Sequence, residues 1–173
     1  SENMVLQRNM RVPVWGWADP GEKITATLGG HQAEAITGVD GRWKLFLGPL
    51  DAGGPFVLNL AGKNNVTLEN VLVGEVWVCS GQSNMAMEVQ SCMNARKEIE
   101  LADHPSIRYF QVARTKALEP LEDVFLTDNA KAEWLNMWNV CSPATVGYLT
   151  GVGYFFGRNL HEILDCPIGL ISA

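Results

Sequence analysis

Apolar residues in the first part of the chain occur in short runs, separated by clusters of glycine, proline, asparagine and aspartate. Polar side chains such as Thr25, Thr27 and Lys44 interleave with the apolar ones, as in strands with one wet face and one dry face. The clusters between the runs favour tight turns. The pattern predicts six strands, at 12–17, 24–28, 33–37, 43–47, 56–60 and 66–72. We expect them to form an antiparallel β-sandwich.

The hydrophobic pattern changes at residue 73. Apolar runs at 76–79 and 168–172 predict two buried strands, and residues 107–112 have a strand-like pattern between them. Between them, two segments follow the period of an amphipathic helix, at 94–102 and 152–164. Apolar strands that alternate with helices are typical of a parallel sheet covered on both faces. An α/β domain over 73–173 is therefore expected to follow a β domain over 1–72.

The longer of the two helices is expected to bury one apolar stripe. Its members are Val152, Phe155, Phe156, Leu160, Ile163 and Leu164. Trp77 lies within the first apolar strand and is expected to be largely buried against this helix. The acidic, aperiodic segment 120–129 is expected to be a surface loop.

Composition and charge narrow the classes of partner. An apolar fraction of 47% can fill a core in a chain of 173 residues, which predicts a globular protein. The net charge of −6 comes without any run of lysine or arginine, so nucleic acid is not an expected partner. The sequence has no apolar stretch of membrane-spanning length, and it opens without the pattern of a secretory signal.

The four cysteines are widely spaced and form no C-x-x-C motif. They are Cys79, Cys92, Cys141 and Cys166. This spacing argues against a zinc or redox motif. One or two disulfides remain possible, and four buried thiols are the favoured interpretation.

A serine-rich turn follows the first apolar strand of the second half, in the order Ser80-Gly81-Gln82-Ser83-Asn84. Ligands of open α/β sheets bind beyond the carboxyl ends of the strands. Gly81 permits a sharp turn, after which Ser83 can present its hydroxyl and its backbone N–H to one space. That arrangement suits nucleophilic attack on an ester. From spacing alone, a serine that caps a helix or fills a turn is the other interpretation.

Residues 74–85, GEVWVCSGQSNM, resemble the first catalytic block of the sialate O-acetylesterase family, a branch of the SGNH or GDSL-like hydrolases. Other segments resemble further parts of the same family, at 3–8, 14–22, 40–43, 152–158 and 167–171. The resemblance covers nearly the whole chain. It implies a jelly-roll-like β-sandwich domain at 1–72, followed by the first, incomplete part of an α/β SGNH-hydrolase domain at 73–173.

The resemblance also implies roles for single residues. Ser83 would be the nucleophile that attacks an acetyl carbonyl, and its backbone N–H would be one oxyanion donor. Gln82 and Asn84 would lie in the wall of the site, and Ser80 would be a structural serine of the turn. No metal and no organic cofactor are implied.

The sequence departs from the family in lacking the residues that activate the serine. No aspartate is followed by a histidine three positions later, and His31, His104 and His161 are each expected to be solvated or packed. The catalytic Asp-x-x-His pair, and the glycine and asparagine that complete the oxyanion hole, are expected beyond residue 173. The expected partner is therefore the remaining C-terminal part of the hydrolase domain.

The implied reaction is hydrolysis of O-acetyl esters on sialic acids, in a secreted, periplasmic or lysosomal setting. Asn65-Val66-Thr67 is a glycosylation sequon that fits such a setting. One alternative is an acetylesterase for other acylated glycans such as xylan. Another is a non-catalytic carbohydrate-binding module that uses Trp15, Trp17 and Trp43, although tryptophans in a sandwich are expected to be core residues.

Overall fold

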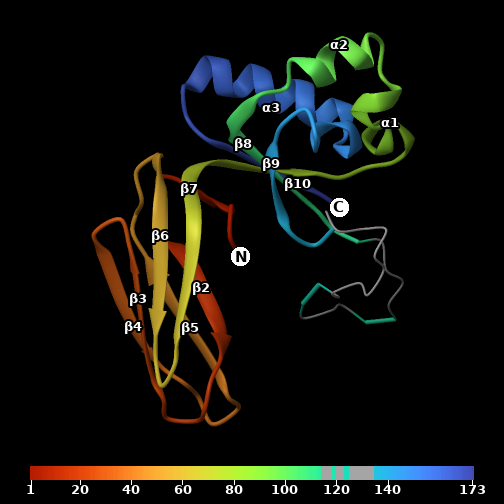
Figure 1. Cartoon of the computed structure of the whole chain (residues 1–173). Coiled ribbons are helices and arrows are strands. Elements are labelled where there is room, and N and C mark those ends of the chain that lie inside the picture. The colour runs from red at the N-terminus through yellow and green to blue at the C-terminus, as the bar shows by residue number, and fades with distance from the viewer. Residues whose placement is uncertain (114–117, 120–122, 125–134) are drawn as a thin grey trace. The chain divides into compact units, whose positions relative to one another are not determined.

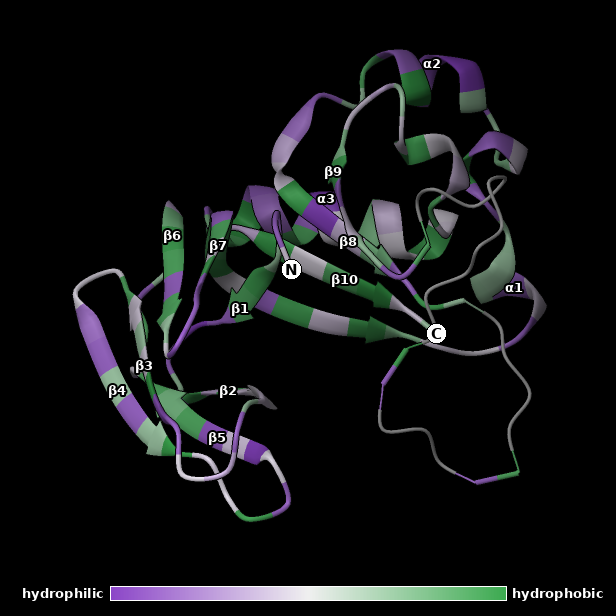
Figure 2. Ribbon diagram, turned by 60° about the horizontal axis from the view of Figure 1, so that its bottom comes forward, coloured by the Kyte–Doolittle hydropathy of each residue, from purple (hydrophilic) through white to green (hydrophobic). Residues whose placement is uncertain are grey.

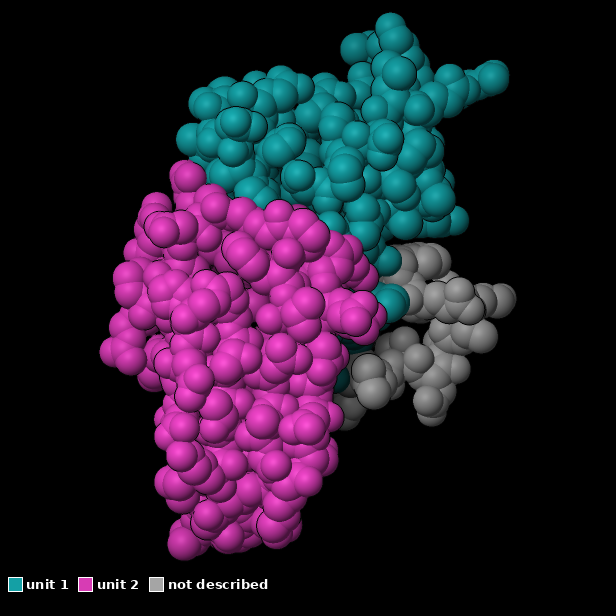
Figure 3. All heavy atoms as spheres, turned by 60° about the vertical axis from the view of Figure 1, so that its left-hand side comes forward, with its two compact units in different colours: residues 1, 75–173 teal, residues 2–74 magenta. Residues whose placement is uncertain are grey.

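The chain divides into two compact units, as seen in the computed structural model (Figures 1 and 3). Residues 2–74 form one unit, and residues 75–173, with Ser1, form the other. The structure describes residues 1–113, 118–119, 123–124 and 135–173. The surface loop expected at 120–129 lies largely outside these residues. Within the described ranges, every helix is too short or too polar to cross a membrane.

The unit of residues 2–74 is built from strands alone. They are β1 (Val5–Gln7), β2 (Val12–Trp17), β3 (Lys23–Leu28), β4 (His31–Ile36), β5 (Arg42–Leu47), β6 (Gly53–Ala61) and the first part of β7 (Asn65–Cys79). Strands β4, β3, β6 and β7 pair antiparallel in that order, β1 pairs parallel with β7, and β2 pairs antiparallel with β5. All six predicted strands are present.

The two sheets of this unit share one apolar core. Every second residue of β5 is buried, beginning with Trp43, and these side chains cluster with the buried positions of β3, such as Ala26. Gly16 lets the Trp43 indole approach closely, because an added Cβ there would lie 2.8 Å from Trp43 Cζ2. Trp43 is thus a core residue, as predicted. The same prediction was wrong for Trp15 and Trp17, which alternate onto the opposite face of β2 and are exposed.

In the described part of residues 75–173, four strand segments pair side by side and helices pack on them. The end of β7 pairs parallel with β10 (Ile168–Ser172), β10 pairs parallel with β8 (His104–Gln111), and β8 pairs antiparallel with β9 (Trp138–Cys141). The helical elements are α1 (Ser83–Ala86), η1 (Val89–Ser91), α2 (Ala95–Glu100), η2 (Val146–Tyr148) and α3 (Gly151–Leu164). Apolar residues dominate the buried strand β10, which is mostly green in Figure 2.

Strand β7 continues through residues where two strands were predicted. Its 15 residues include Gly74, which is buried and extended and does not interrupt the strand. Residues 65–74 pair with β6 and β1, whereas residues 75–79 pair with β10. In the order of the described strands, β7 stands between β6 and β10 and is not an edge strand. The strand that leads to the turn with Ser83 is thus an inner strand, and its end pairs parallel with β10.

Helix α3 begins and ends within one residue of its predicted bounds, but its buried face is a different one. The buried residues include Gly153, Tyr154 and Gly157, whereas Val152 and Ile163 are exposed. Glycine brings the helix backbone close to the sheet: an added Cβ at Gly157 would lie 2.9 Å from Leu170 Cδ1. The contact is made by backbone and small residues, which an apolar periodicity does not detect.

Trp77 contacts α3 as predicted but is not largely buried. Its ring meets that of Phe156 edge-on at 5.2 Å between centroids, while 45% of the residue stays exposed. Val78, on the other face of β7, is 67% exposed. Successive side chains of a strand point to opposite faces of the sheet, so both faces of β7 are partly open to solvent here. The expected cover on both faces of the sheet was therefore wrong at this strand.

The close approach of α3 to the sheet predicts that Gly157→Val lowers the free energy of unfolding by about 2–3 kcal/mol, because the added methyl groups collide with Leu170. Urea unfolding measures the loss. Asn159→Val is the matched control, since Asn159 lies exposed on the same helix and gains the same side chain. Equal stability of the two variants would show that the helix does not pack through Gly157.

Candidate active site

Ser83 follows β7 after a short turn at residues 80–82 and is the first residue of α1. The intervening turn is closed by a hydrogen bond from the Ala86 N–H to the Gln82 carbonyl at 3.0 Å. An added Cβ at Gly81 would lie 3.3 Å from the Met85 Cβ, so a glycine suits this turn. Ser83 is exposed, and no described residue hydrogen-bonds its hydroxyl. Ser80, for which the resemblance implies a structural role in the turn, is exposed as well.

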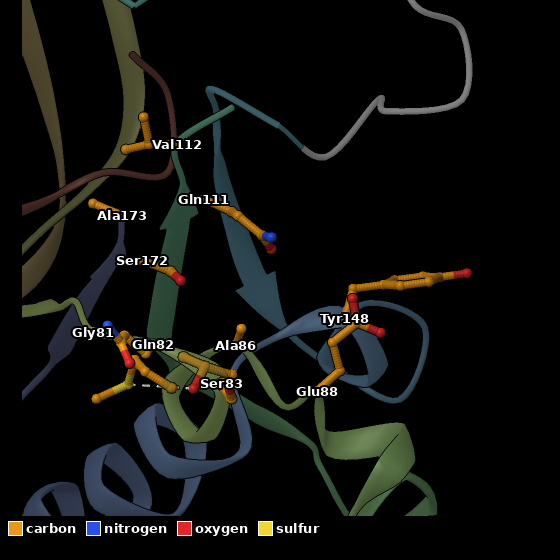
Figure 4. A pocket seen from close by; sticks show the side chains of 12 residues that line it. Gly81, Gln82, Ser83, Ala86, Glu88, Gln111, Val112, Tyr148, Ser172 and Ala173 are labelled. Carbon is orange, nitrogen blue, oxygen red and sulfur yellow. Dashed lines mark hydrogen bonds between the residues drawn. The ribbon is translucent and has the colours of Figure 1, made fainter. Parts of the chain in front are cut away.

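The turn opens onto a cavity of about 460 Å³ at the carboxyl ends of β7, β8 and β10 (Figure 4). The ends are held in register, because the Ala173 N–H donates to the Cys79 carbonyl at 3.1 Å and the Val112 N–H donates to the Ser172 carbonyl at 2.8 Å. This is the edge at which open α/β sheets bind ligands. The lining residues are Gly81, Gln82, Ser83, Met85, Ala86, Glu88, Gln111, Val112, Tyr148, Thr150, Ser172 and Ala173.

The residues singled out in the sequence are distributed unequally around this cavity. Gln82 and Ser83 line it, whereas Asn84 is exposed and is not among the lining residues. Figure 4 shows Gln111 and Ser172 at the ends of two neighbouring strands, with Ser83 below them in this view. Gln111 and Ser172 were not predicted as site residues from the sequence. Each stands at or near the end of a predicted strand, and this position could have indicated them.

Two further polar groups in the wall differ in how they are satisfied. The Glu88 carboxylate accepts a hydrogen bond from the Gln90 side-chain amide at 2.5 Å. The Gln111 side-chain oxygen is buried and has no hydrogen-bond partner among the described residues. A buried acceptor without a partner is costly, typically about 1–3 kcal/mol.

The floor of the cavity is tied to the start of α3. Thr150 is buried and caps the helix by accepting from the Gly153 N–H at 3.5 Å. Its hydroxyl also meets the Met85 sulfur at 3.5 Å, the contact dashed in Figure 4. The Gly151 N–H donates to the Met87 carbonyl at 2.8 Å. The segment that carries Ser83 is thereby anchored to the helix below it.

No histidine lines the cavity, and all three histidines of the chain are described. His104 begins β8, about 23 Å along the strand from Gln111 at the cavity end. Burial, followed by the nearby Arg158 charge, lowers the pKa of His104. The Nδ1 atom of His161 lies 2.7 Å from the Cys166 carbonyl oxygen, and His31 lies in the other unit. The structure therefore places no imidazole beside Ser83.

The cysteines are free thiols, and three of the four are buried. The exception to the predicted burial is Cys92, which is half-buried and meets the Glu88 carbonyl at 3.5 Å. Burial raises the pKa of the Cys141 thiol to about 12 and also raises that of Cys79. Cys79 lies under the cavity floor, because an added Cβ at Gly153 would lie 3.2 Å from its sulfur. Within the described part of the chain, no three metal-ligating side chains gather into a site.

Comparison with known proteins gives one consistent family. The chain is 35% identical to a sialate O-acetylesterase of Mus musculus over 98% of its own length and 34% of that protein. It is 34% identical to the sialate O-acetylesterase of Homo sapiens over 100% of its own length and 35% of that protein. No family model matches the sequence.

The solved structures include a similar fold. The crystal structure of a carbohydrate acetylesterase from Xanthomonas citri superposes with a TM-score of 0.92 at 31% identity, covering 99% of this chain and 38% of that one. The chain thus spans about a third of the length of the curated relatives that it matches. The predicted resemblance is confirmed: the chain belongs to the sialate O-acetylesterase family.

Proposed function

We propose that this chain carries the nucleophile of a serine esterase that removes O-acetyl groups from sugars. The observation that carries the proposal is the position of Ser83, exposed in the cavity where the parallel strands end, with a hydroxyl that no described residue engages. Membership of a family whose characterised relatives are named as acetylesterases supports the same chemistry.

In the proposed reaction, Ser83 Oγ attacks the acetyl carbonyl carbon and its proton passes to a base. The carbonyl oxygen becomes an oxyanion, which needs donors about 3 Å away. The Ser83 N–H suits this role because the N–H of the first residue of a helix has no hydrogen-bond acceptor within the helix. The sugar leaves as an alcohol that takes up a proton, and an acetyl-serine remains. Water then attacks this ester, releasing acetate and restoring Ser83.

The substrate we propose is an O-acetylated sialic acid, because the relatives are named as sialate O-acetylesterases. A cavity of about 460 Å³ is within the size range of small-ligand pockets. The side-chain amides of Gln82 and Gln111, two residues that line the cavity, can hydrogen-bond to hydroxyls of the sugar. Other acetylated glycans such as xylan remain the second candidate, because the neighbour from Xanthomonas citri is named only as a carbohydrate acetylesterase.

We further propose that the site is completed by polypeptide outside these 173 residues, which would supply an Asp-x-x-His pair and the remaining oxyanion donors. The absence of a histidine from the cavity supports this. So do Trp77 and Val78 on β7, which are 45% and 67% exposed and offer apolar surface on which further chain could pack. On this proposal, residues 1–72 are a jelly-roll-like sandwich domain and residues 73–173 are part of an SGNH domain, acting in a secreted or lysosomal setting.

The substrate assignment predicts that a longer form of the protein, containing the missing part of the site, releases acetate from 9-O-acetylated sialic acid with a higher kcat/KM than from acetylated xylan. Acetate release on the two substrates measures the ratio. The Ser83→Ala form supplies the background. A higher kcat/KM on acetylated xylan would transfer the assignment to plant-type glycans, and no Ser83-dependent release from either would reject the esterase proposal.

A further inference from the structure

A second surface, in the unit of residues 2–74, gathers aromatic and cationic side chains. In the register of β2 with β5, Pro13 faces Phe46, Trp15 faces Lys44 and Trp17 faces Arg42. Directly paired residues of antiparallel strands lie on the same side of a sheet. These six residues are here called the β2–β5 outer face. Trp15 is 62% exposed, Trp17 57% and Phe46 41%.

Tryptophans this exposed need an explanation, because large apolar side chains on soluble proteins usually gather in the core or at binding sites. Trp15 and Trp17 are two residues apart on one strand, so their side chains stand about 7 Å from each other along it. Indole rings offer an electron-rich face to the C–H bonds of a sugar ring. The pair can therefore stack two neighbouring sugars of one glycan.

The charge of this face is opposite to that of the whole chain. Neither β2 nor β5 contains an acidic residue, while Arg42 and Lys44 belong to β5. Arg11 precedes β2, and its guanidinium lies 5.3 Å from the centre of the Phe46 ring; the Lys44 ammonium lies at the same distance. Such cation–π contacts hold the two cations at the surface. A chain with a net charge of −6 thus presents a local cationic face.

An open hollow next to Trp17 supplies polar groups. It is lined by Trp17, Ala18, Asp19, Glu22, Lys63 and Asn64. The acids of this hollow are engaged: Asp19 pairs with the Lys63 ammonium, and Glu22 accepts from the Lys63 N–H at 2.6 Å. They are fixed acceptors for sugar hydroxyls. The hollow therefore extends the aromatic face with hydrogen-bonding groups.

We propose that the β2–β5 outer face is a binding site for an acidic glycan, with sugar rings on Trp15 and Trp17 and a carboxylate of the glycan at Lys44 and Arg11. Charge selects the carboxylate, since an anionic ligand is repelled by the rest of the chain and attracted here. The site uses none of the residues around Ser83. It would hold an acidic glycan without any ester chemistry.

Binding of polysialic acid to the 173-residue chain tests the proposal, by isothermal titration calorimetry at low and high salt. We expect binding that weakens as salt rises, and a loss of at least tenfold in affinity for the Trp15→Ala/Trp17→Ala variant. The matched control is Ile36→Ala/Val39→Ala, which removes two exposed apolar residues of the same unit from outside the face. Thermal unfolding verifies that both variants stay folded.

A second pair of variants tests whether binding of the glycan depends on the positive charge of this face. Lys44→Ala should weaken binding several-fold, whereas Lys97→Ala, an exposed lysine on α2, should leave it unchanged. Equal binding of an uncharged glucan hexasaccharide would overturn the acidic specificity. Equal losses in the tryptophan variant and its control, or no binding of polysialic acid, would overturn the site. Because the readout is binding alone, it is independent of the outcome for Ser83.

Discussion

Replacing Ser83 with alanine is expected to abolish the proposed acetyl-ester hydrolysis in a longer form of the protein that supplies the proposed base, lowering the turnover number by on the order of a millionfold. The loss corresponds to about 8 kcal/mol of transition-state stabilisation. The loss is so large because, in the proposed mechanism, the Ser83 hydroxyl forms the covalent intermediate. Ser172, another hydroxyl that lines the cavity, lies at the end of β10 and not on the turn.

Ser80→Ala is the matched control for this experiment. Ser80 is exposed in the same turn, three residues before Ser83, but it does not line the cavity. Hydrolysis of p-nitrophenyl acetate, followed with burst kinetics, should show the acetyl-enzyme in the wild type and in Ser80→Ala but not in Ser83→Ala. Loss of the burst in Ser80→Ala with retention in Ser83→Ala would move the nucleophile to Ser80 and refute the proposed assignment.

The strands of the first unit could be predicted because local signals determine them. Turn residues such as Gly21, Gly29 and Gly41 adopt positive φ angles at the ends of strands, as their sequence contexts suggest. Strand β7 was divided wrongly at residue 73, because the sequence shows a change in hydrophobic pattern there but contains no turn. A change in burial from one unit to the next does not require the chain to leave the extended conformation.

The faces of elements were harder to predict than the elements. In α3, the large apolar side chains Val152 and Ile163 mark the wrong side, because Gly153 and Gly157 allow the backbone itself to pack on the sheet. In β2, apolar residues occupy both faces, so alternation gave no sign that Trp15 would be outside. Hydrophobicity reports which residues gain from burial, but close packing decides which are buried.

The candidate site, too, could be predicted only in part. The turn that carries Ser83 is contiguous in sequence, so the family block at 74–85 located it directly. Gln111 and Ser172 reach the cavity from β8 and β10, and the parallel order of β7, β10 and β8 brings them beside the turn with Ser83. That order depends on long-range strand pairing, which no local pattern in the sequence determines.

The 173-residue chain by itself is expected to be a very poor esterase, although it contains the proposed nucleophile, Ser83. A serine hydroxyl is a weak nucleophile until a base takes its proton. Among the residues that line the cavity there is no histidine, and His104 lies at the opposite end of β8. In a well-studied serine hydrolase, removal of the base costs about as much as removal of the whole triad, on the order of a millionfold in turnover.

The expected result is a rate on p-nitrophenyl acetate that is close to background and is the same for the wild-type chain and its Ser83→Ala form. A longer form that includes the further sequence should then hydrolyse the ester faster by several orders of magnitude, and Ser83→Ala should remove that gain. A fast, Ser83-dependent rate in the 173-residue chain would instead require a base within it. Glu88, whose carboxylate lines the cavity, would be the first residue to test, with Glu88→Gln, because the distance along β8 excludes His104 from contact with Ser83.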